Sequence, residues 1–249
     1  MPANPNARLL AALAVLAPSA CLAQSFNIDL DIVSTAVGAN AVGAPSSSFG
    51  AAASQPGYWN AVQNSTATNV TAPITLNNLA GAPTGVTINM SNNAPNGFAH
   101  WSYFPGANTG DFALLLNDCH VVNNSPLPNI TNTYTFNGLQ PGIYDVITYG
   151  VRPLPGQSST RVDVAGAGIQ NITGPMPGNA FALGVTHSWH TLTITGSSIT
   201  VTVDRDPLNP SVGAYINGFQ LHHTPVPTPG SGALLGAAGL LAARRRRRA

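Results

Sequence analysis

The sequence predicts an all-β fold, an antiparallel β-sandwich, for the part of the chain between its two ends. Short segments alternate apolar and polar residues with a period of two, which is the pattern of a half-buried strand. Turns containing Gly or Pro separate these segments at short intervals. Sustained helical periodicity is missing between the ends, and roughly ten short strands joined by such turns are typical of a sandwich.

Residues 26–33 form the first strand candidate, and their alternation predicts one core face and one solvent face. The apolar positions are Phe26, Ile28, Leu30 and Ile32, and the polar positions are Asn27, Asp29 and Asp31. The Ala/Gly/Ser-rich stretch 34–57 has no period and is predicted to be a long loop. Further strands are expected at 74–79, 86–90, 131–136, 143–151 and 161–164, short apolar segments lie at 112–116 and 119–122, and irregular chain is expected at 91–110 and 166–178.

The last third of the body has the clearest alternation. Residues 189–195 and 198–204 both place threonines on the outer side, and their inward positions are Leu192, Ile194, Ile199, Val201 and Val203. Because Gly196 and Ser197 form a turn between them, the two strands are predicted to pair as a hairpin with facing threonines. Residues 214–221 are predicted to form one final strand.

The N-terminal 23 residues have the pattern of a secretory signal peptide. Arg8 precedes the apolar run 9–16, and the small residues that follow predict cleavage after Ala23. A signal helix is therefore expected, followed by one domain at residues 24–224. A second interpretation makes Cys21 a lipidated cysteine, with Pro18 where such a motif usually has Leu.

The C-terminal residues 225–249 have three parts. A proline-spaced stretch comes first, an uncharged run at 231–243 that is compatible with a hydrophobic helix comes next, and five arginines follow. The residues that define the tail are Pro225, Pro227, Thr228, Pro229, Arg244, Arg245, Arg246, Arg247 and Arg248. This order predicts a membrane-sorting tail.

The tail resembles a bacterial PEP-CTERM sorting signal. The resemblance implies an exosortase-type processing enzyme as partner, transient anchoring in the inner membrane, and delivery to the cell surface or extracellular matrix. The family motif usually has Glu between its prolines, where this chain has Val226 or Thr228. An uncleaved membrane anchor is the alternative.

The body between the two ends is mildly acidic. It carries three arginines and eight aspartates, a net charge of −5, whereas the whole chain has +1. This balance argues against nucleic acid as a partner, because such binding needs clustered Lys and Arg. With Cys21 removed, Cys119 has no partner for an internal disulfide, and its apolar neighbours predict that it is buried.

A second resemblance covers most of residues 26–221. Its pieces are Gly57-x-Trp59-Asn60, Gly138-Leu139-x-Pro141-Gly142-x-Tyr144-Asp145-Val146, the threonine-rich strands, and Ile216-Asn217-Gly218-Phe219-Gln220-Leu221. Together they resemble the galactose-binding-like jelly rolls, which implies sugar sites in loops and, in many members, a structural calcium. An immunoglobulin or fibronectin-III sandwich is the alternative, because the Leu-x-Pro-Gly-x-Tyr turn also occurs there.

Two sets of residues are candidates for ligand sites. Aromatic rings in loops can stack on the apolar face of a sugar, and the candidates are Trp101, Tyr103, Tyr58 and Trp59, although Trp59 alternatively plugs the core. Calcium prefers the hard oxygen ligands that aspartate supplies, and the candidate pairs are Asp29 with Asp31 and Asp204 with Asp206. The alternative for these pairs is a solvated strand edge or turn.

The sequence therefore predicts an exported, non-enzymatic protein that binds carbohydrate or exopolysaccharide. A structural matrix or biofilm protein without a specific ligand is the alternative. A hydrolase is disfavoured, because the chain has no glutamate and no spaced aspartate pair for acid–base catalysis. Cys119 and His120 are neighbours on a strand and point to opposite faces, so they cannot form a nucleophile–base pair.

Overall fold

The structure is a computed structural model of the chain. It describes residues 23–31, 43–63, 70–95, 98–102, 108–123, 130–153, 156–175, 178–209 and 212–226, and for residues 100–102 and 123 it describes the backbone alone. Gln24–Thr224 form one compact unit. Both terminal helices predicted from the sequence lie outside the described residues. Within the ranges given, no helix is long and apolar enough to cross a membrane.

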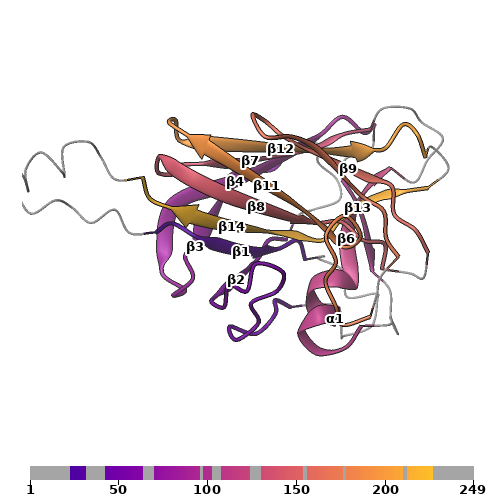
Figure 1. Ribbon diagram of the computed structural model, residues 1–249, viewed down its shortest axis with the longest axis horizontal. Coiled ribbons are helices and arrows are strands. Elements are labelled where there is room, and N and C mark those ends of the chain that lie inside the picture. Colours follow the sequence, from indigo (N-terminus) through magenta and orange to yellow (C-terminus); the bar gives the residue numbers. More distant parts are fainter. Residues whose placement is uncertain are drawn as a thin grey trace, which may run out of the picture. The chain divides into compact units, whose positions relative to one another are not determined.

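The described chain is mostly strand, with one short helix, and its strands form three sheets (Figure 1). The five-stranded sheet has the order β11 (His187–Ile194), β8 (Gly142–Tyr149), β14 (Gly218–Thr224), β1 (Phe26–Asp29) and β2 (Trp59–Ala61). The six-stranded sheet has the order β10 (Gly168–Ile172), β9 (Thr160–Val164), β12 (Ser198–Arg205), β7 (Asn132–Asn137), β4 (Pro83–Asn92) and β3 (Ile74–Asn77). The three-stranded sheet has the order β13 (Ala214–Ile216), β6 (Asp118–Asn123) and β5 (Ala99–Ser102). Neighbouring strands are antiparallel, except for the parallel pair of β1 and β2.

The core lies between the inner faces of the five- and six-stranded sheets. The first sheet contributes Phe26, Ile28, Tyr144, Val146, Phe219 and Leu221, and the second contributes Ile88, Tyr134, Phe136, Ile199, Val201 and Val203. Two layers that bury their facing side chains in this way are consistent with a β-sandwich. The predicted inward positions of β12 are confirmed, and those of β11 lie on the same inner side.

The predicted hairpin between residues 189–195 and 198–204 is wrong. β11 pairs with β8 in the five-stranded sheet, whereas β12 pairs with β7 and β9 in the six-stranded sheet. The turn at Gly196 and Ser197 therefore carries the chain from one layer to the other. Alternation predicts which side of each strand is buried, but it does not specify the partner strand.

The predicted final strand 214–221 is divided into β13 and β14, which belong to different sheets. Asn217 lies at the division, and its side chain satisfies backbone groups of the strands that meet there. Its Nδ2 donates to the carbonyl of Asp118 (2.6 Å), and its Oδ1 accepts from the amide of Val151 (2.7 Å). Because Asn217 is fully buried, these bonds are needed to offset the desolvation of its amide.

Three further elements correct the sequence prediction. The short apolar segment around Phe112 belongs to helix α1 (Gly110–Leu116), and β5 and β10 lie in stretches expected to be irregular. A seven-residue helix has fewer than two turns, too few for its period to be recognised in the sequence. The prediction that Cys119 is buried is confirmed.

Candidate functional site

The outer face of the five-stranded sheet is half covered. Residues 43–57 and helix α1 lie over it, and together they are called the cover. Ser46 ties the two parts of the cover together, because its amide and its hydroxyl both bond the carboxylate of Asp111 at 2.7 Å. The polar face of β1 lies beneath the cover, and the predicted solvent face of this strand is therefore buried.

A buried polar network joins the cover to the sheet. The amide groups of Gln55 and Gln220 both donate to Oδ1 of Asn27, at 2.9 and 2.8 Å. The hydroxyl of Tyr149 donates to Oε1 of Gln220 at 2.6 Å and accepts from the amide of Ala52 at 2.9 Å. Burial raises the pKa of Tyr149, so its hydroxyl stays protonated as a donor. These bonds specify how the cover lies on the strands.

An apolar cluster completes the cover. Phe49 packs edge-on against Phe112 with 5.0 Å between ring centroids, and Phe181 stacks on Phe112 at 4.8 Å. Trp59 joins this cluster with 2% of its surface exposed, and its indole donates to the carbonyl of Phe49 at 3.0 Å. The sequence predicted that Trp59 stacks on a sugar, with a plug of the core as the alternative. Its burial in this cluster agrees with the alternative. Its neighbour Tyr58 is 41% exposed.

The other half of this outer face is open to solvent. Its residues, which we call the open face, are Ile143, Asp145, Trp189, Thr191, Thr193 and His222, from β8, β11 and β14. The strand register places Thr191, Asp145 and His222 side by side in one row across three strands. Trp189 stands in the next row, about 7 Å along the strand.

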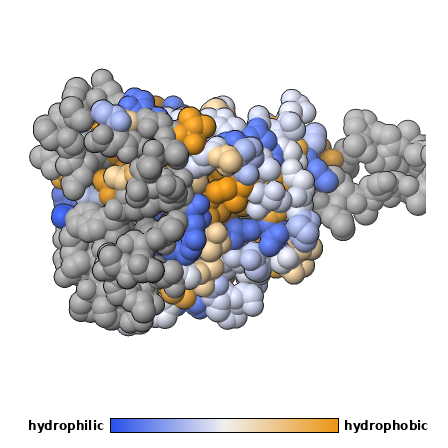
Figure 2. Space-filling model, turned by 180° about the vertical axis from the view of Figure 1, so that it is seen from behind, coloured by the Kyte–Doolittle hydropathy of each residue, from blue (hydrophilic) through white to orange (hydrophobic). Residues whose placement is uncertain are grey.

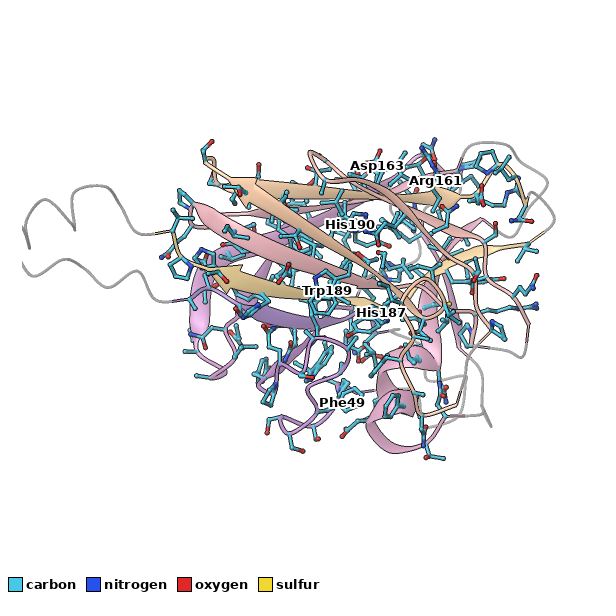
Figure 3. The ribbon with its side chains drawn as sticks, viewed as in Figure 1. Phe49, Arg161, Asp163, His187, Trp189 and His190 are labelled. Carbon is cyan, nitrogen blue, oxygen red and sulfur yellow. The ribbon has the colours of Figure 1, made fainter. Side chains whose placement is uncertain are left out.

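Trp189 is held in place by a neighbouring strand. Its backbone amide donates to Oε1 of Gln170 at 3.0 Å, and its carbonyl accepts from Nε2 of Gln170 at 2.6 Å. Gln170 belongs to β10, so one side chain bonds two backbone groups on the free edge of β11. The indole keeps 36% of its surface exposed. Figure 3 shows Trp189 and His190 leaving β11 on opposite sides, as alternation requires.

The polar row beside Trp189 is connected through one carboxylate. The hydroxyl of Thr191 donates to Oδ1 of Asp145 in a short hydrogen bond, and Nδ1 of His222 lies 3.7 Å from Oδ2. Both Asp145 and His222 keep part of their side chains exposed. The open face therefore combines an aromatic plane with oriented acceptors and donors, which is what a sugar requires of a binding site.

The two buried histidines of β11 are neutral near pH 7. Burial lowers the pKa of His187, which lies against Tyr149 and Phe181, to about 4. Burial also lowers the pKa of His190 on the inner face, and the charge of Asp163 opposes this shift in part. A neutral imidazole that is almost fully buried behaves as a core residue, so neither ring belongs to the open face.

Asp29 and Asp31 lie on the covered side of β1 and are both buried. Among the described residues, neither carboxylate oxygen of Asp29 has a hydrogen-bond partner, whereas Oδ2 of Asp31 accepts from Gln63 at 3.1 Å. Burial, and then the charge of Asp31, raises the pKa of Asp29 well above its usual value. A buried carboxylate without partners fits a cation, because an oxygen-preferring ion would stabilise its charge.

The second aspartate pair does not fit a cation in the same way. Oδ2 of Asp204 forms an ion pair with Arg161 at 2.7 Å. Oδ1 of Asp206 accepts from the amide of Leu208 at 3.0 Å, and its Oδ2 accepts from Asn171 at 3.2 Å, which is the bonding of a turn. Among the described residues, no group of three His, Cys, Asp or Glu side chains could hold a metal ion.

Several sequence candidates fall where their side chains are not described. Trp101 lies on β5, of which the backbone is described at that position, and Tyr103 lies outside the described residues. Pro227, Thr228, Pro229 and Arg244–Arg248 of the tail also lie outside them. Trp189 was not among the residues predicted from the sequence. Its phase with Thr191 and Thr193 places it on the solvent side of its strand, and this pattern could have identified it.

No protein-family model matches the chain, and no curated protein sequence matches it. A protein of Bacillus subtilis, YXIM, is similar in structure at 10% identity with a TM-score of 0.41, over 81% of this chain and 40% of its own. A β-(1,4)-mannanase with a CBM35 module from Podospora anserina aligns at 10% identity with a TM-score of 0.32, over 57% and 29%. An exo-β-1,3-galactanase from Phanerochaete chrysosporium aligns at 15% identity with a TM-score of 0.27, over 57% and 35%. The chain thus spans well under half the length of each.

Proposed function

We propose that this chain is an exported, non-enzymatic protein of the cell surface or extracellular matrix that binds carbohydrate through its open face. The observation that carries this proposal is Trp189, an aromatic ring left exposed on a strand surface beside a row of polar groups. The finer fold that we propose is a galactose-binding-like jelly roll. The alternative of an immunoglobulin-like sandwich leaves the open face unchanged.

The open face suits a neutral sugar. A pyranose ring stacked on Trp189 would place its hydroxyls next to Thr191 and Asp145, and a carboxylate accepts hydrogen bonds from such hydroxyls. Asp145 would repel an acidic polymer, and the net charge of the body is also negative. Neutral polysaccharides are therefore the expected ligands.

Binding to a panel of neutral and acidic polysaccharides tests the proposal. Trp189→Ala is expected to weaken binding of the retained polysaccharide by at least about 30-fold, because aromatic anchors at binding sites contribute about 2 kcal/mol or more. Thr202→Val on the opposite sheet is the matched control and should leave binding unchanged. Equal binding by wild type and Trp189→Ala would refute the role of the open face.

Trp101→Ala separates this site from the loop aromatics predicted by the sequence. If the loops hold the sugar, Trp101→Ala weakens binding and Trp189→Ala does not. If the open face holds the sugar, Trp189→Ala weakens binding and Trp101→Ala does not. The same assay therefore decides between the two locations.

Export rests on the two ends of the sequence. We propose cleavage after Ala23 and removal of the tail near Pro229 by an exosortase-type enzyme in the membrane. Mass spectrometry of the protein from its own cells measures both ends directly. Recovery of the intact chain, with residues 230–249 attached, would exclude processing of the tail and favour an uncleaved anchor.

A structural calcium is a further part of the proposal. Asp29 and Asp31 would hold it, with backbone carbonyls completing the six to eight oxygen ligands that calcium takes. The support is the carboxylate of Asp29, which is buried and has no hydrogen-bond partner in the part of the chain that the structure describes. The ion would supply the charge compensation that this carboxylate lacks.

A structural matrix protein without a specific ligand is the second candidate, and a different surface favours it. The outer face of the six-stranded sheet presents two rows of polar residues across β12, β7 and β4. One row is Thr200, Thr135 and Asn89, and the other is Thr202, Thr133 and Ser91. Such an array of hydroxyl and amide groups, with Asp163 beside Thr202, offers many similar hydrogen bonds. This candidate predicts no saturable binding to any polysaccharide in the panel.

A further inference from the structure

The first residue of the proposed mature chain, Gln24, sits among groups that the sequence places far away. Its backbone nitrogen donates to Nδ1 of His223 at 2.9 Å, across 199 positions of the chain. Its side-chain oxygen Oε1 accepts from the backbone amide of Gln140 at 2.8 Å and lies 3.4 Å from the hydroxyl of Tyr144. Both functional groups of Gln24 are thus fixed by other parts of the fold.

His223 is itself held in one orientation. Its Nε2 lies 3.3 Å from the carbonyl of Pro141, which can only accept, so Nε2 carries the proton and Nδ1 is an acceptor. The ring stacks on Tyr144 with 4.6 Å between centroids. A side chain at Gly142 would collide with Nε2, so the missing Cβ at this position makes room for the ring. Burial lowers the pKa of His223, which keeps the imidazole neutral near pH 7.

Cleavage after Ala23 changes the chemistry of the nitrogen of Gln24, which takes part in one of these contacts. In the intact chain the nitrogen of Gln24 is a peptide amide. After cleavage it is an α-amine, a nucleophile with a basic nitrogen of His223 at hydrogen-bond distance. The donors to Oε1 then lie where negative charge develops if the amine attacks the side-chain amide.

We propose that the folded domain promotes cyclisation of Gln24 to pyroglutamate at the new N-terminus. The α-nitrogen forms a bond to the side-chain Cδ, and the bond from Cδ to the amide nitrogen breaks. His223 takes the proton from the attacking amine and returns it to the departing nitrogen, which leaves as ammonia. The backbone amide of Gln140 stabilises the oxygen during the attack. The hydroxyl of Tyr144, whose one proton is shared with the carbonyl of Gln140 at 3.0 Å, contributes less. No electron transfer or co-reactant is required.

This inference rests on the export part of the proposed function, because it needs cleavage after Ala23. It is independent of sugar binding. The product would be an uncharged N-terminus at the end of the sandwich, where β1 begins beside the end of β14 (Figure 1). A lactam cannot be removed by aminopeptidases that require a free amine, so the modification would protect the exported protein.

The full-length protein is produced with its own signal sequence and purified, and its N-terminal peptide is followed by mass spectrometry over time. A peptide beginning at residue 24 and lighter by one ammonia is expected for wild type. A peptide that begins with an unmodified Gln24 and stays so overturns the inference and leaves export intact. A peptide that begins at another residue overturns the cleavage site and with it the inference.

Three variants and a comparison with the unfolded chain separate promotion by the fold from spontaneous cyclisation. His223→Gln is expected to slow conversion about 100-fold, the usual contribution of a positioned base. Tyr144→Phe keeps the stacked ring and is expected to slow it by less, which preserves the test if His223→Gln folds poorly. Thr202→Val alters an outward residue of the six-stranded sheet, whereas His223 belongs to the five-stranded sheet, and should convert like wild type. Conversion that is no faster in the folded chain than in the same chain unfolded by guanidinium chloride would overturn the proposal.

Discussion

The two outer faces of the sandwich come from similar sequence patterns and have different surroundings. On the six-stranded sheet, Thr133, Thr135, Thr200 and Thr202 face outward and remain partly exposed, as alternation predicts. On the five-stranded sheet, the equivalent positions of β1 are completely buried beneath the cover. Figure 2 shows the molecule from behind, with a described surface that is largely white and blue and orange in small patches. A period of two therefore identifies the core side of a strand, but not whether its other side is exposed.

The buried polar groups under the cover differ in how they are satisfied. Asn27 and Gln220 have partners in the network, so their desolvation is offset by hydrogen bonds. Asp29, two residues farther along β1, has no hydrogen-bond partner for its carboxylate within the described ranges of the chain. The network therefore serves the fold, whereas the calcium site proposed above would account for the buried carboxylate of Asp29.

The largest expected effect distinguishes the covered aromatic from its exposed neighbour. Trp59→Ala should lower the free energy of unfolding by about 3–5 kcal/mol, because it removes a buried ring and leaves a cavity under the cover. Tyr58→Ala is the matched control and should change stability by about 0.5 kcal/mol or less. Chemical denaturation measures both. A small loss for Trp59→Ala would mean that residues 43–57 contribute little to stability.

The next effect concerns calcium at Asp29. Added calcium at about 100 times its dissociation constant should raise the free energy of unfolding by about 2.7 kcal/mol, and Asp29→Asn should abolish this gain. Asp206→Asn lies in the other aspartate pair and should retain it. Isothermal titration calorimetry measures the same binding directly. Equal calcium responses of wild type and Asp29→Asn would exclude Asp29 as a ligand.

Asp29 also predicts a pH dependence in calcium-free buffer. Because its pKa is raised in the folded state, the folded state binds a proton more tightly than the unfolded state. This contribution to stability is fully present below the usual aspartate pKa of about 3.9, and it is lost as the pH rises through the raised value. Asp29→Asn should remove this fall. Calcium should oppose it in wild type, since the ion favours the ionised carboxylate.

Much of the fold could be predicted from the sequence, because local alternation decides which side of a strand is apolar. The inner faces of β1 and β12 were found in this way. The strand partners of β11 and β12 could not be found, because the choice depends on residues far away in the chain. The cover was missed for the same reason: the stretch 43–57 has no period of its own, and its contacts are with β8 and β14.

The residues of the candidate site also differ in whether local alternation could predict them. Trp189 could have been found, since its phase with Thr191 identifies an aromatic residue on a polar face. The surroundings of Gln24 could not, because its partners lie more than a hundred positions away. The burial of Trp59 and Asp29 depends on the cover, so local alternation alone could not decide between the alternatives for either residue.

The smallest expected effect tests whether the outward threonines of the six-stranded sheet contribute to the stability of the fold. Thr202→Val keeps the β-branched shape and removes one outward hydroxyl, so the free energy of unfolding should change by less than about 0.5 kcal/mol. Thr191→Val on the open face removes the hydrogen bond to Asp145 and should cost about 1 kcal/mol. Chemical denaturation of both variants in the same buffer gives the comparison. If Thr202→Val costs more than Thr191→Val, the threonine face of the six-stranded sheet requires its hydroxyls for stability, and the open face would be the less important of the two for the fold.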